Sequence, residues 1–361
     1  MQKYIFIHLL NDFSGSPKVL SQIIKTVQSN GRDLELYTCK SKGGFLSGIA
    51  VKHHKYYYKY SKYKFIVLLI FIYSQIILFC KLLKYFNKDV VIYINTMLPF
   101  GAALAGFLMR KQVVYHIHEI SLKPKILKQF LRFIIKLTAD KIIFVSNTVK
   151  LSEHIAGKKE YMVYNSIPKS FLDEAINQHL DIKKASFNVL MLASLKKYKG
   201  IDEFIEIASK LNSSKSICFT LAINASKKDI AKFLKKKVVT NNIKVLSGRS
   251  NVIPFYKRAS LVLNLSHVDS CIETFGLTLI EAMSFGVPVI APPIGGPTEI
   301  ITNNVEGYLI SSYEKDSITE KITNLSLDKN EWLRLSKNAL IRSKYFNEKV
   351  FKEKILKILN E

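Results

Sequence analysis

Two glutamates in the second half of the chain, Glu273 and Glu281, have seven residues between them, and a glycine pair, Gly295–Gly296, follows. Carboxylates are poor ligands for phosphate, but they accept hydrogen bonds from hydroxyl groups. The pair therefore suits a hydroxyl-rich ligand such as a ribose or a hexose. The same residues could instead be a helix-capping glutamate and a surface glutamate, both favoured by the helix dipole. Which of these they are depends on the elements that position them.

Runs of β-branched residues alternate with amphipathic stretches along the whole chain, which predicts parallel sheets covered by helices on both faces. In the first half we expect strands at 4–10, 89–96, 112–119, 141–146 and 161–165, and helices at 16–29 and 100–110. In the second half we expect strands at 187–194, 217–224, 243–248, 261–266, 287–292 and 307–310, a helix over 277–285, and helices from about 314 onward.

The polar stretch 171–186 separates the two halves and is the expected linker. A length of 361 residues also exceeds what one hydrophobic core usually covers. We therefore predict an α/β protein with two doubly wound domains, residues 1–180 and 186–345. Ligands of such domains lie beyond the carboxyl ends of the strands.

The chain carries 54 Lys and Arg against 28 Asp and Glu, a net charge of +26. This surplus predicts an anionic partner, which could be nucleic acid, anionic lipid or a phosphorylated substrate. No helix-turn-helix, RNP-type or zinc motif supports nucleic acid. The first apolar run is short and is broken by His8, so we expect a buried strand there rather than a signal peptide, and a cytoplasmic protein. Free thiols are expected at all four cysteines, Cys39, Cys80, Cys218 and Cys271.

The segment 52–86 departs from this pattern, because it is basic and aromatic and contains an apolar run at 65–80. That run has 16 residues, including Ser74 and Gln75, and a spanning helix needs about 20. Three interpretations stay open: a buried core helix, a helix in the membrane interface with its lysines on lipid phosphates, and a transmembrane span.

Four segments occur in order and at close spacing: "ETFGLTLIEAM" from 273, "VPVIAP" from 287, "GGPTEII" from 295 and "EGYLI" from 306. They resemble the nucleotide-sugar site of glycosyltransferase family 4, the retaining transferases of GT-B fold. The resemblance covers roughly residues 185–310 well and the first half loosely. It implies two Rossmann-like domains facing across a cleft, with a nucleotide diphosphate sugar as donor.

The resemblance also implies roles for single residues. Glu273 would contact hydroxyls of the donor sugar, and Glu281 would hold the ribose hydroxyls. Gly295 and Gly296 would lie near the phosphates and the sugar, where backbone must approach the ligand closely. The donor diphosphate would meet the backbone N–H groups at the start of the helix after Glu273, a site suited to anions, formed by Thr274, Phe275, Gly276 and Leu277.

The segment 192–208 resembles the part of the family that clamps the diphosphate, usually Gly-Arg-Leu followed by Lys-Gly. Lys199 with Gly200 matches the Lys-Gly part. Ser194 stands where the family has arginine, although a leaving diphosphate needs a cation if no metal is bound. Lys196 or Lys197 could compensate, or the clamp could be weaker.

In the first half, Gly15 lies in a Ser-Gly-Ser turn between a strand and a helix, where the family has a glycine-rich loop; a structural turn fits equally well. His118 with Glu119 matches the family's histidine and acidic residue that reach the reacting sugar. His116 projects from the same face of the expected strand and fits a packed core residue better.

The resulting prediction is a retaining glycosyltransferase that moves a hexose from a nucleotide diphosphate sugar to a hydroxyl of a lipid-linked or growing surface glycan. His118, Glu273 and Lys199 are the expected catalytic residues. No metal or other cofactor is expected, because no Asp-x-Asp site stands out. The first domain would bind the acceptor, and helix 346–361 would pack back on it.

We expect a peripheral protein at the inner face of the cell membrane, with 52–86 on anionic lipid. Two other classes stay open. One is a nucleotide-sugar-binding protein without transferase activity, which the serine at position 194 permits. The other is a nucleic-acid-binding protein, for which only the charge argues.

Overall fold

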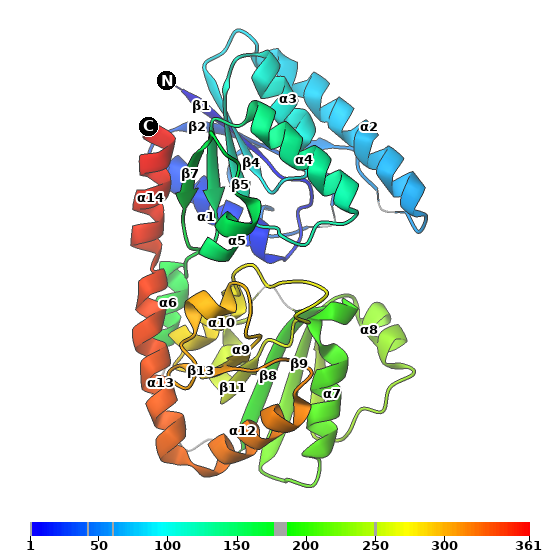
Figure 1. Cartoon of the computed structure of the whole chain (residues 1–361), viewed down its shortest axis with the longest axis vertical. Coiled ribbons are helices and arrows are strands. Elements are labelled where there is room, and N and C mark those ends of the chain that lie inside the picture. The colour runs from blue at the N-terminus through cyan, green and yellow to red at the C-terminus, as the bar shows by residue number, and fades with distance from the viewer. Residues whose placement is uncertain (1, 42, 60, 177–185, 249–250) are drawn as a thin grey trace. The chain divides into compact units, whose positions relative to one another are not determined.

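The computed structural model describes residues 2–41, 43–59, 61–176, 186–248 and 251–361. The chain forms two compact units. The first comprises Met1–Tyr164 with Phe351–Glu361, and the second comprises Asn165–Val350. Figure 1 shows a twisted sheet with helices packed around it in each unit.

The first unit is built on a parallel sheet of seven strands in the order β3-β2-β1-β4-β5-β6-β7. β1 lies in its middle, and Ile5 pairs with Glu35 on one side and with Ile92 on the other. Its apolar residues are fully buried, as expected for a strand covered on both faces. The strands are β1 (Lys3–Ile7), β2 (Asp33–Cys39), β3 (Lys52–Tyr56), β4 (Val90–Asn95), β5 (Gln112–Ile117), β6 (Lys141–Phe144) and β7 (Lys159–Met162).

Helices connect these strands in the manner of a doubly wound fold. They are α1 (Gly15–Ser29), α2 (Lys64–Leu82), α3 (Phe100–Leu108), α4 (Lys125–Thr138) and α5 (Asn147–Glu153). The C-terminal part of α14 (Glu348–Asn360) also belongs to the first unit. Lys141, buried on β6, donates through Nζ to the carbonyl oxygen of Ile358, 2.8 Å away, which attaches α14 to the sheet.

The second unit has a parallel sheet of six strands in the order β10-β9-β8-β11-β12-β13. The strands are β8 (Phe187–Ser194), β9 (Ile217–Asn224), β10 (Ile243–Ser247), β11 (Leu261–Leu263), β12 (Val289–Ala291) and β13 (Gly307–Leu309). The helices are α6 (Lys169–Ile176), α7 (Ile201–Lys210), α8 (Lys227–Leu234), α9 (Ile253–Arg258), α10 (Leu277–Ser284), α11 (Pro297–Ile300), α12 (Lys315–Leu327) and α13 (Lys329–Ser343).

The alternation of strand and helix expected from the sequence is confirmed in both units. Two strands, β2 and β3, were not expected. The apolar run of β2 is interrupted by Glu35, which hides the strand in the sequence. Glu35 is a buried carboxylate that accepts hydrogen bonds from Lys3 and Tyr85. β3 lies at the sheet edge and has the sequence KHHKY, which carries no apolar signal.

The division between the units falls at residues 164 and 165, earlier than the linker expected at 171–186. The first part of that stretch forms α6, whose Phe171 packs on Tyr256 and Phe285 of the second unit. The rest of the expected linker, 177–185, lies outside the described residues.

α2 contains the apolar run 65–80, and the interpretation as a buried core helix is wrong. Only one stripe of the helix is buried, and it includes the two polar residues Ser74 and Gln75. Gln75 accepts a hydrogen bond from the backbone N–H of Gly101 on α3, so its polarity serves the packing of α2 on α3. Among the described residues, α2 is the one helix long and apolar enough to cross a membrane, a statement of length and composition only.

Candidate active site

An ion pair between Lys199 and Glu273 lies at the carboxyl ends of two neighbouring strands of the second unit. The Nζ atom of Lys199 lies 2.8 Å from Oε2 of Glu273 and 3.2 Å from Oγ of Ser266. The same carboxylate oxygen accepts from Ser266 at 3.3 Å and from Asn264 at 3.4 Å. Lys199 follows β8, whereas Asn264 and Ser266 follow β11, so the adjacent strands bring the group together.

The position of Lys199 depends on the glycine after it. Gly200 has φ +75°, in the left-handed region, and a Cβ there would lie 2.2 Å from the carbonyl oxygen of Leu265. No side chain fits at this position, because both the conformation and the close approach exclude one. The Lys-Gly pair thus seats the lysine against the loop that carries Ser266.

The charges of the pair reinforce each other. Burial by itself would raise the pKa of Glu273, but Lys199 holds it below its usual range. Burial would likewise lower the pKa of Lys199, and the charge of Glu273 raises it on balance. Lys199 is therefore an ammonium and Glu273 a carboxylate at neutral pH.

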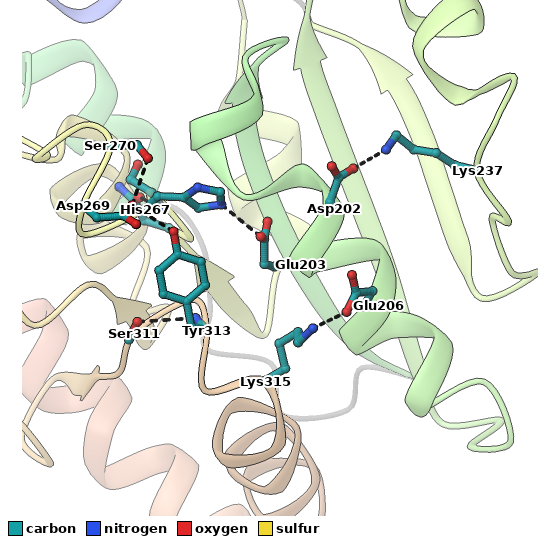
Figure 2. Close-up of polar contacts among 12 residues, drawn as sticks. Asp202, Glu203, Glu206, Lys237, His267, Asp269, Ser270, Ser311, Tyr313 and Lys315 are labelled. Carbon is teal, nitrogen blue, oxygen red and sulfur yellow. Dashed lines mark hydrogen bonds and ion pairs between the residues drawn. The ribbon is translucent and has the colours of Figure 1, made fainter.

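The loop carrying Asn264 and Ser266 is fixed to α7 and to the segment before α12 by a second set of polar contacts, shown in Figure 2. His267 contacts Oε1 of Glu203 through Nε2 at 2.9 Å, and the Tyr313 hydroxyl donates to Asp269 at 2.9 Å. The imidazole of His267 also lies 5.1 Å from the Tyr313 ring. These contacts hold the loop in place beside the ion pair.

The glycine pair lies directly against the segment Glu273–Phe275. A Cβ on Gly295 would lie 2.5 Å from the carbonyl oxygen of Glu273, and one on Gly296 would lie 2.3 Å from Cα of Phe275. The N–H of Gly296 donates to that Glu273 carbonyl at 2.8 Å. From the sequence, we expect these glycines to allow a ligand to approach. The close contact between their loop and the segment Glu273–Phe275 already requires glycine at both positions.

The helix α10 begins immediately after this segment. Gly276, at φ +105°, is its N-cap and has no side chain that could cap the first turn, which starts at Leu277. Phe275 is buried and packs edge-on against Phe346, with ring centroids 5.7 Å apart. Thr274 is the part-buried residue between Glu273 and Phe275. The N-terminal N–H groups of α10 form a region suited to an anion.

Glu281 lies in the second turn of α10, as expected, and is buried. Its Oε2 accepts a hydrogen bond from the hydroxyl of Tyr256, at 2.8 Å, from α9. Glu281 and Glu273 thus have different protein partners. Sequence reasoning missed Tyr256, because nothing in the segment near 256 indicated a partner for a carboxylate.

Ser194, which stands at the expected arginine position, is the last residue of β8. Lys196 and Lys197 follow it, and both are exposed. The ammonium of Lys196 lies 5.8 Å from the centroid of the Tyr198 ring. Lys199 is thus the partly buried cation of this segment, and compensation by Lys196 or Lys197 stays a prediction.

In the first unit, His118 belongs to a chain of polar contacts at the carboxyl ends of β1, β4 and β5. Nε2 of His118 donates to Oδ1 of Asn95 at 2.9 Å. The side-chain nitrogen of Asn95 donates to the backbone oxygen of Ser16 at 3.2 Å, and Nδ1 of His8 contacts both this nitrogen, at 3.2 Å, and the backbone oxygen of Asn95, at 3.1 Å. Sequence reasoning named His118 and Gly15, which begins α1 next to Ser16, but missed His8 and Asn95. The signal that could have identified His8 and Asn95 is that each lies at the carboxyl end of an expected strand, where ligands of such sheets bind.

The imidazoles of this cluster are neutral. Burial, with His116 and His8 nearby, holds the pKa of His118 well below its usual range. Burial lowers the pKa of His116 to about 3, and its Nδ1 contacts the Tyr93 hydroxyl at 3.0 Å, as expected of a packed core residue. Burial raises the pKa of Glu119 to about 7, although its carboxylate accepts from the N–H groups of His118 and Met97.

Within the described residues, no three or more His, Cys, Asp and Glu side chains are grouped so that they could hold a metal ion. The ion pair and the start of α10 are charged features of the second unit that suit a phosphorylated ligand.

Comparison with known proteins agrees with this geometry. Residues 173–342 match the family model of the glycosyl transferases group 1. Sucrose synthase of Melioribacter roseus is 38% identical over 91 residues, which are 24% of this chain and 12% of that enzyme. Sucrose-phosphate synthase of Spinacia oleracea is 36% identical over 92 residues, 26% of this chain and 9% of that enzyme. The matched part spans about a tenth of these relatives' length.

A solved structure matches over the whole chain. Anabaena HepE in complex with UDP and glucose aligns over 100% of both chains with a TM-score of 0.81 and 20% identity. The chain therefore has the GT-B fold, with two Rossmann-like domains, as the sequence predicted.

Proposed function

We propose that this chain is a retaining glycosyltransferase of family 4 that uses a nucleotide diphosphate sugar. The observation that carries the proposal is the Lys199–Glu273 pair, since Glu273 lies just before the N-terminus of α10, whose N-cap is a glycine. A cation and the backbone N–H groups at a helix start suit a diphosphate, and a carboxylate suits sugar hydroxyls. The match of residues 173–342 to a family of glycosyl transferases supports the same activity.

In the proposed reaction, the bond between the anomeric carbon and the diphosphate oxygen breaks as the acceptor hydroxyl attacks from the same face. The hydroxyl proton passes to the departing diphosphate. The ammonium of Lys199 and the N–H groups at the start of α10 stabilise the charge that develops on the leaving group. Glu273 orients the sugar and keeps Lys199 charged, and Glu281 holds the ribose. No metal is required in this route.

His118 is proposed to assist at the reacting sugar. Because its Nε2–H is donated to Asn95, its Nδ1 is left as an acceptor, and its low pKa keeps it neutral. A neutral imidazole can accept a hydrogen bond from a hydroxyl group without repelling an oxocarbenium-like centre. Gly15 is proposed to belong to the loop that meets donor and acceptor.

The donor nucleotide to test first is UDP, because HepE was solved in complex with UDP and glucose. A hexose on UDP is the simplest donor consistent with that neighbour. The proposed acceptor is a lipid-linked or growing surface glycan, and the proposed location is the inner face of the cell membrane. The exposed apolar side of α2 and the lysines before it, Lys55, Lys59 and Lys62, support a membrane contact.

Thermal unfolding with a panel of UDP and GDP sugars tests the donor, since a ligand that binds only the folded state raises the melting temperature. We expect one sugar nucleotide to stabilise the native chain and to have no effect on Lys199→Met. Lys237→Met, which breaks an ion pair with Asp202 elsewhere in the same unit, is the matched control and should respond like the native chain.

Release of nucleotide in the presence of a membrane glycan extract then separates a transferase from a binding protein. Stabilisation without release, across several acceptor preparations, would favour the nucleotide-sugar-binding alternative. Stabilisation by none of the panel would contradict the proposal.

A further inference from the structure

The exposed apolar surface of the first unit extends well beyond α2. α3 packs against both α2 and α4, and the three helices lie side by side on one side of the sheet (Figure 1). The ring of Phe100 on α3 links them, 5.7 Å from Phe71 on α2 and 5.1 Å from Phe130 on α4. The large apolar side chains exposed on these helices are Phe65, Ile66, Leu68, Leu69, Ile72, Tyr73, Ile76, Phe107, Leu108, Ile126, Phe130, Phe133 and Leu137.

α4 shows that this exposure follows a pattern. Ile126, Phe130, Phe133 and Leu137 are spaced by four, three and four residues, so they form one stripe of the helix. Phe133 is 61% exposed and Ile126 is 78% exposed. A second stripe of the helix, Leu131 with Ile134 and Ile135, is buried against the unit. α4 therefore has two apolar faces, of which the core uses one.

The charge on these helices has a single sign. Residues 64–82 contain lysine, residues 125–138 contain lysine and arginine, and residues 100–108 contain no charged residue; none of the three ranges contains aspartate or glutamate. Lys125 and Lys136 are exposed on α4 beside the apolar stripe. An apolar face flanked by exposed cations complements an anionic lipid surface, and it would be unfavourable against a basic or neutral polar partner.

A basic hollow lies at the end of this face. It has a volume of about 580 Å³ and is formed where α3 and α4 end and β5, β6 and β7 begin. Phe107 and Leu137 belong both to the exposed apolar face and to its lining. The charged residues that line it are Arg110, Lys111, Lys141, Lys158, Lys159, Asp140 and Glu361.

The acidic residues of the hollow are already engaged. Asp140 accepts from the backbone N–H of Val113 at 2.7 Å, and Glu361 accepts from the Tyr161 hydroxyl at 2.5 Å. Lys141 donates to the carbonyl oxygen of Ile358. In the part of the chain that the structure describes, the remaining four cations have no ion-pair partner: Arg110, Lys111, Lys158 and Lys159.

We propose that the helices α2, α3 and α4 form a membrane-docking face and that the hollow at its end binds the phosphate headgroup of an anionic phospholipid. The acyl chains would lie along the apolar stripe and the phosphate against the four cations, with Phe107 and Leu137 between the two. This inference extends the membrane contact of the proposed function, but it assigns the headgroup to a site outside the segment 52–86.

Flotation of the purified full chain with vesicles tests the proposal. We expect tighter binding to phosphatidylcholine mixed with phosphatidylglycerol in equal parts than to phosphatidylcholine alone. The variant Lys158→Gln with Lys159→Gln should lose about fivefold in affinity per neutralised cation on the mixed vesicles alone. Phe133→Gln should lose about tenfold on both kinds of vesicle, because its ring no longer enters the acyl region.

Matched controls lie in the second unit. Lys235→Gln with Lys236→Gln removes the same charge from an exposed lysine pair, and Leu327→Gln replaces a side chain that is 78% exposed. Both should bind like the native chain. Native affinity in the Lys158 and Lys159 variant, an equal loss in the Lys235 and Lys236 variant, or equal binding to both vesicles would overturn the proposal.

The sugar-nucleotide response of the same preparations is read separately by thermal unfolding. A lost response with intact vesicle binding counts against the transferase alone. A retained response shows that each variant is folded, so that a change in vesicle binding is attributable to the surface.

Discussion

The carboxylate of Glu273 has the ammonium of Lys199 2.8 Å away, on a residue 74 positions earlier in the chain. The two side chains are 18% and 25% exposed, so water screens the pair only in part. Either residue alone at this depth would be a costly charge. The pair is therefore both a structural contact of the second unit and the centre of the proposed site.

Lys199→Met should lower the free energy of unfolding by about 1–3 kcal/mol at neutral pH, less than for a fully buried pair because both groups are partly exposed. The native pKa of Glu273 is depressed, so its stabilising contribution is present above about pH 4.5 and is lost as the pH falls through the native pKa. The difference between native and variant chains should thus shrink in acid. Urea unfolding at pH 7 and at about pH 3 measures it. An equal difference in unfolding free energy at both pH values would contradict the assignment of Glu273 as the charged partner of Lys199.

Gly296→Ala should displace the segment Glu273–Phe275, because its Cβ would lie 2.3 Å from Cα of Phe275. We expect a loss of about 1–3 kcal/mol in unfolding free energy, together with loss of sugar-nucleotide binding. Calorimetric titration with the nucleotide and thermal unfolding check the two effects. Gly31→Ala is the control, since Gly31 has φ +72° and no neighbouring atom within 4 Å, and it should bind normally. Normal binding by Gly296→Ala would show that the loop contact is dispensable.

Tyr256→Phe should cost about 1–3 kcal/mol of stability, because Oε2 of buried Glu281 loses a hydrogen-bond donor while the ring packing on Phe285 is kept. If Glu281 holds the ribose, nucleotide affinity should fall as well. Urea unfolding and calorimetric titration measure these two quantities. Tyr345→Phe removes a hydroxyl from a ring that is 71% exposed and should change neither. Unchanged stability in Tyr256→Phe would show that the hydrogen bond to Glu281 does not stabilise the fold.

Asn95→Asp should raise the pKa of His118, because a carboxylate replaces the amide oxygen that accepts from Nε2. In the native chain the pKa of His118 is depressed, so the unfolded state takes up the proton first and stability falls as the pH drops below about 6.5. The imidazole signals of His118 in NMR should stay unchanged between about pH 5 and 8 in the native chain and titrate in the variant. Titration of His118 near 6.5 in the native chain would refute the neutral assignment.

Several features of this protein were predictable because they depend on residues close together in the sequence. The α/β class follows from buried strands such as 90–95, whose uniform apolar character is typical of a parallel sheet covered on both faces. The start of the helix after Glu273 was predictable from Gly276. A close backbone approach at 295–296 was predictable because both residues are glycines. Even so, the reason for that pair lay elsewhere, in the backbone of Glu273 and Phe275.

Other features required the fold. Tyr256 reaches Glu281 from another helix, and Asn95 reaches His118 from a neighbouring strand. Glu35 can be buried in β2 because Lys3 and Tyr85 donate hydrogen bonds to its carboxylate. Since both partners are distant in sequence, the local sequence predicts an exposed glutamate. Hydrogen bonds between side chains far apart in sequence depend on strand order, which no short segment encodes.

The sequence by itself thus determined the class of fold, the residues whose side chains could take part in binding or catalysis, and the basic, apolar character of 52–86. The tertiary structure decided which of these residues meet and which face of α2 is buried. The physical reason is that hydrophobic periodicity and glycine conformation act over a few residues. An ion pair such as Lys199–Glu273 forms only when parallel strands place their carboxyl ends side by side.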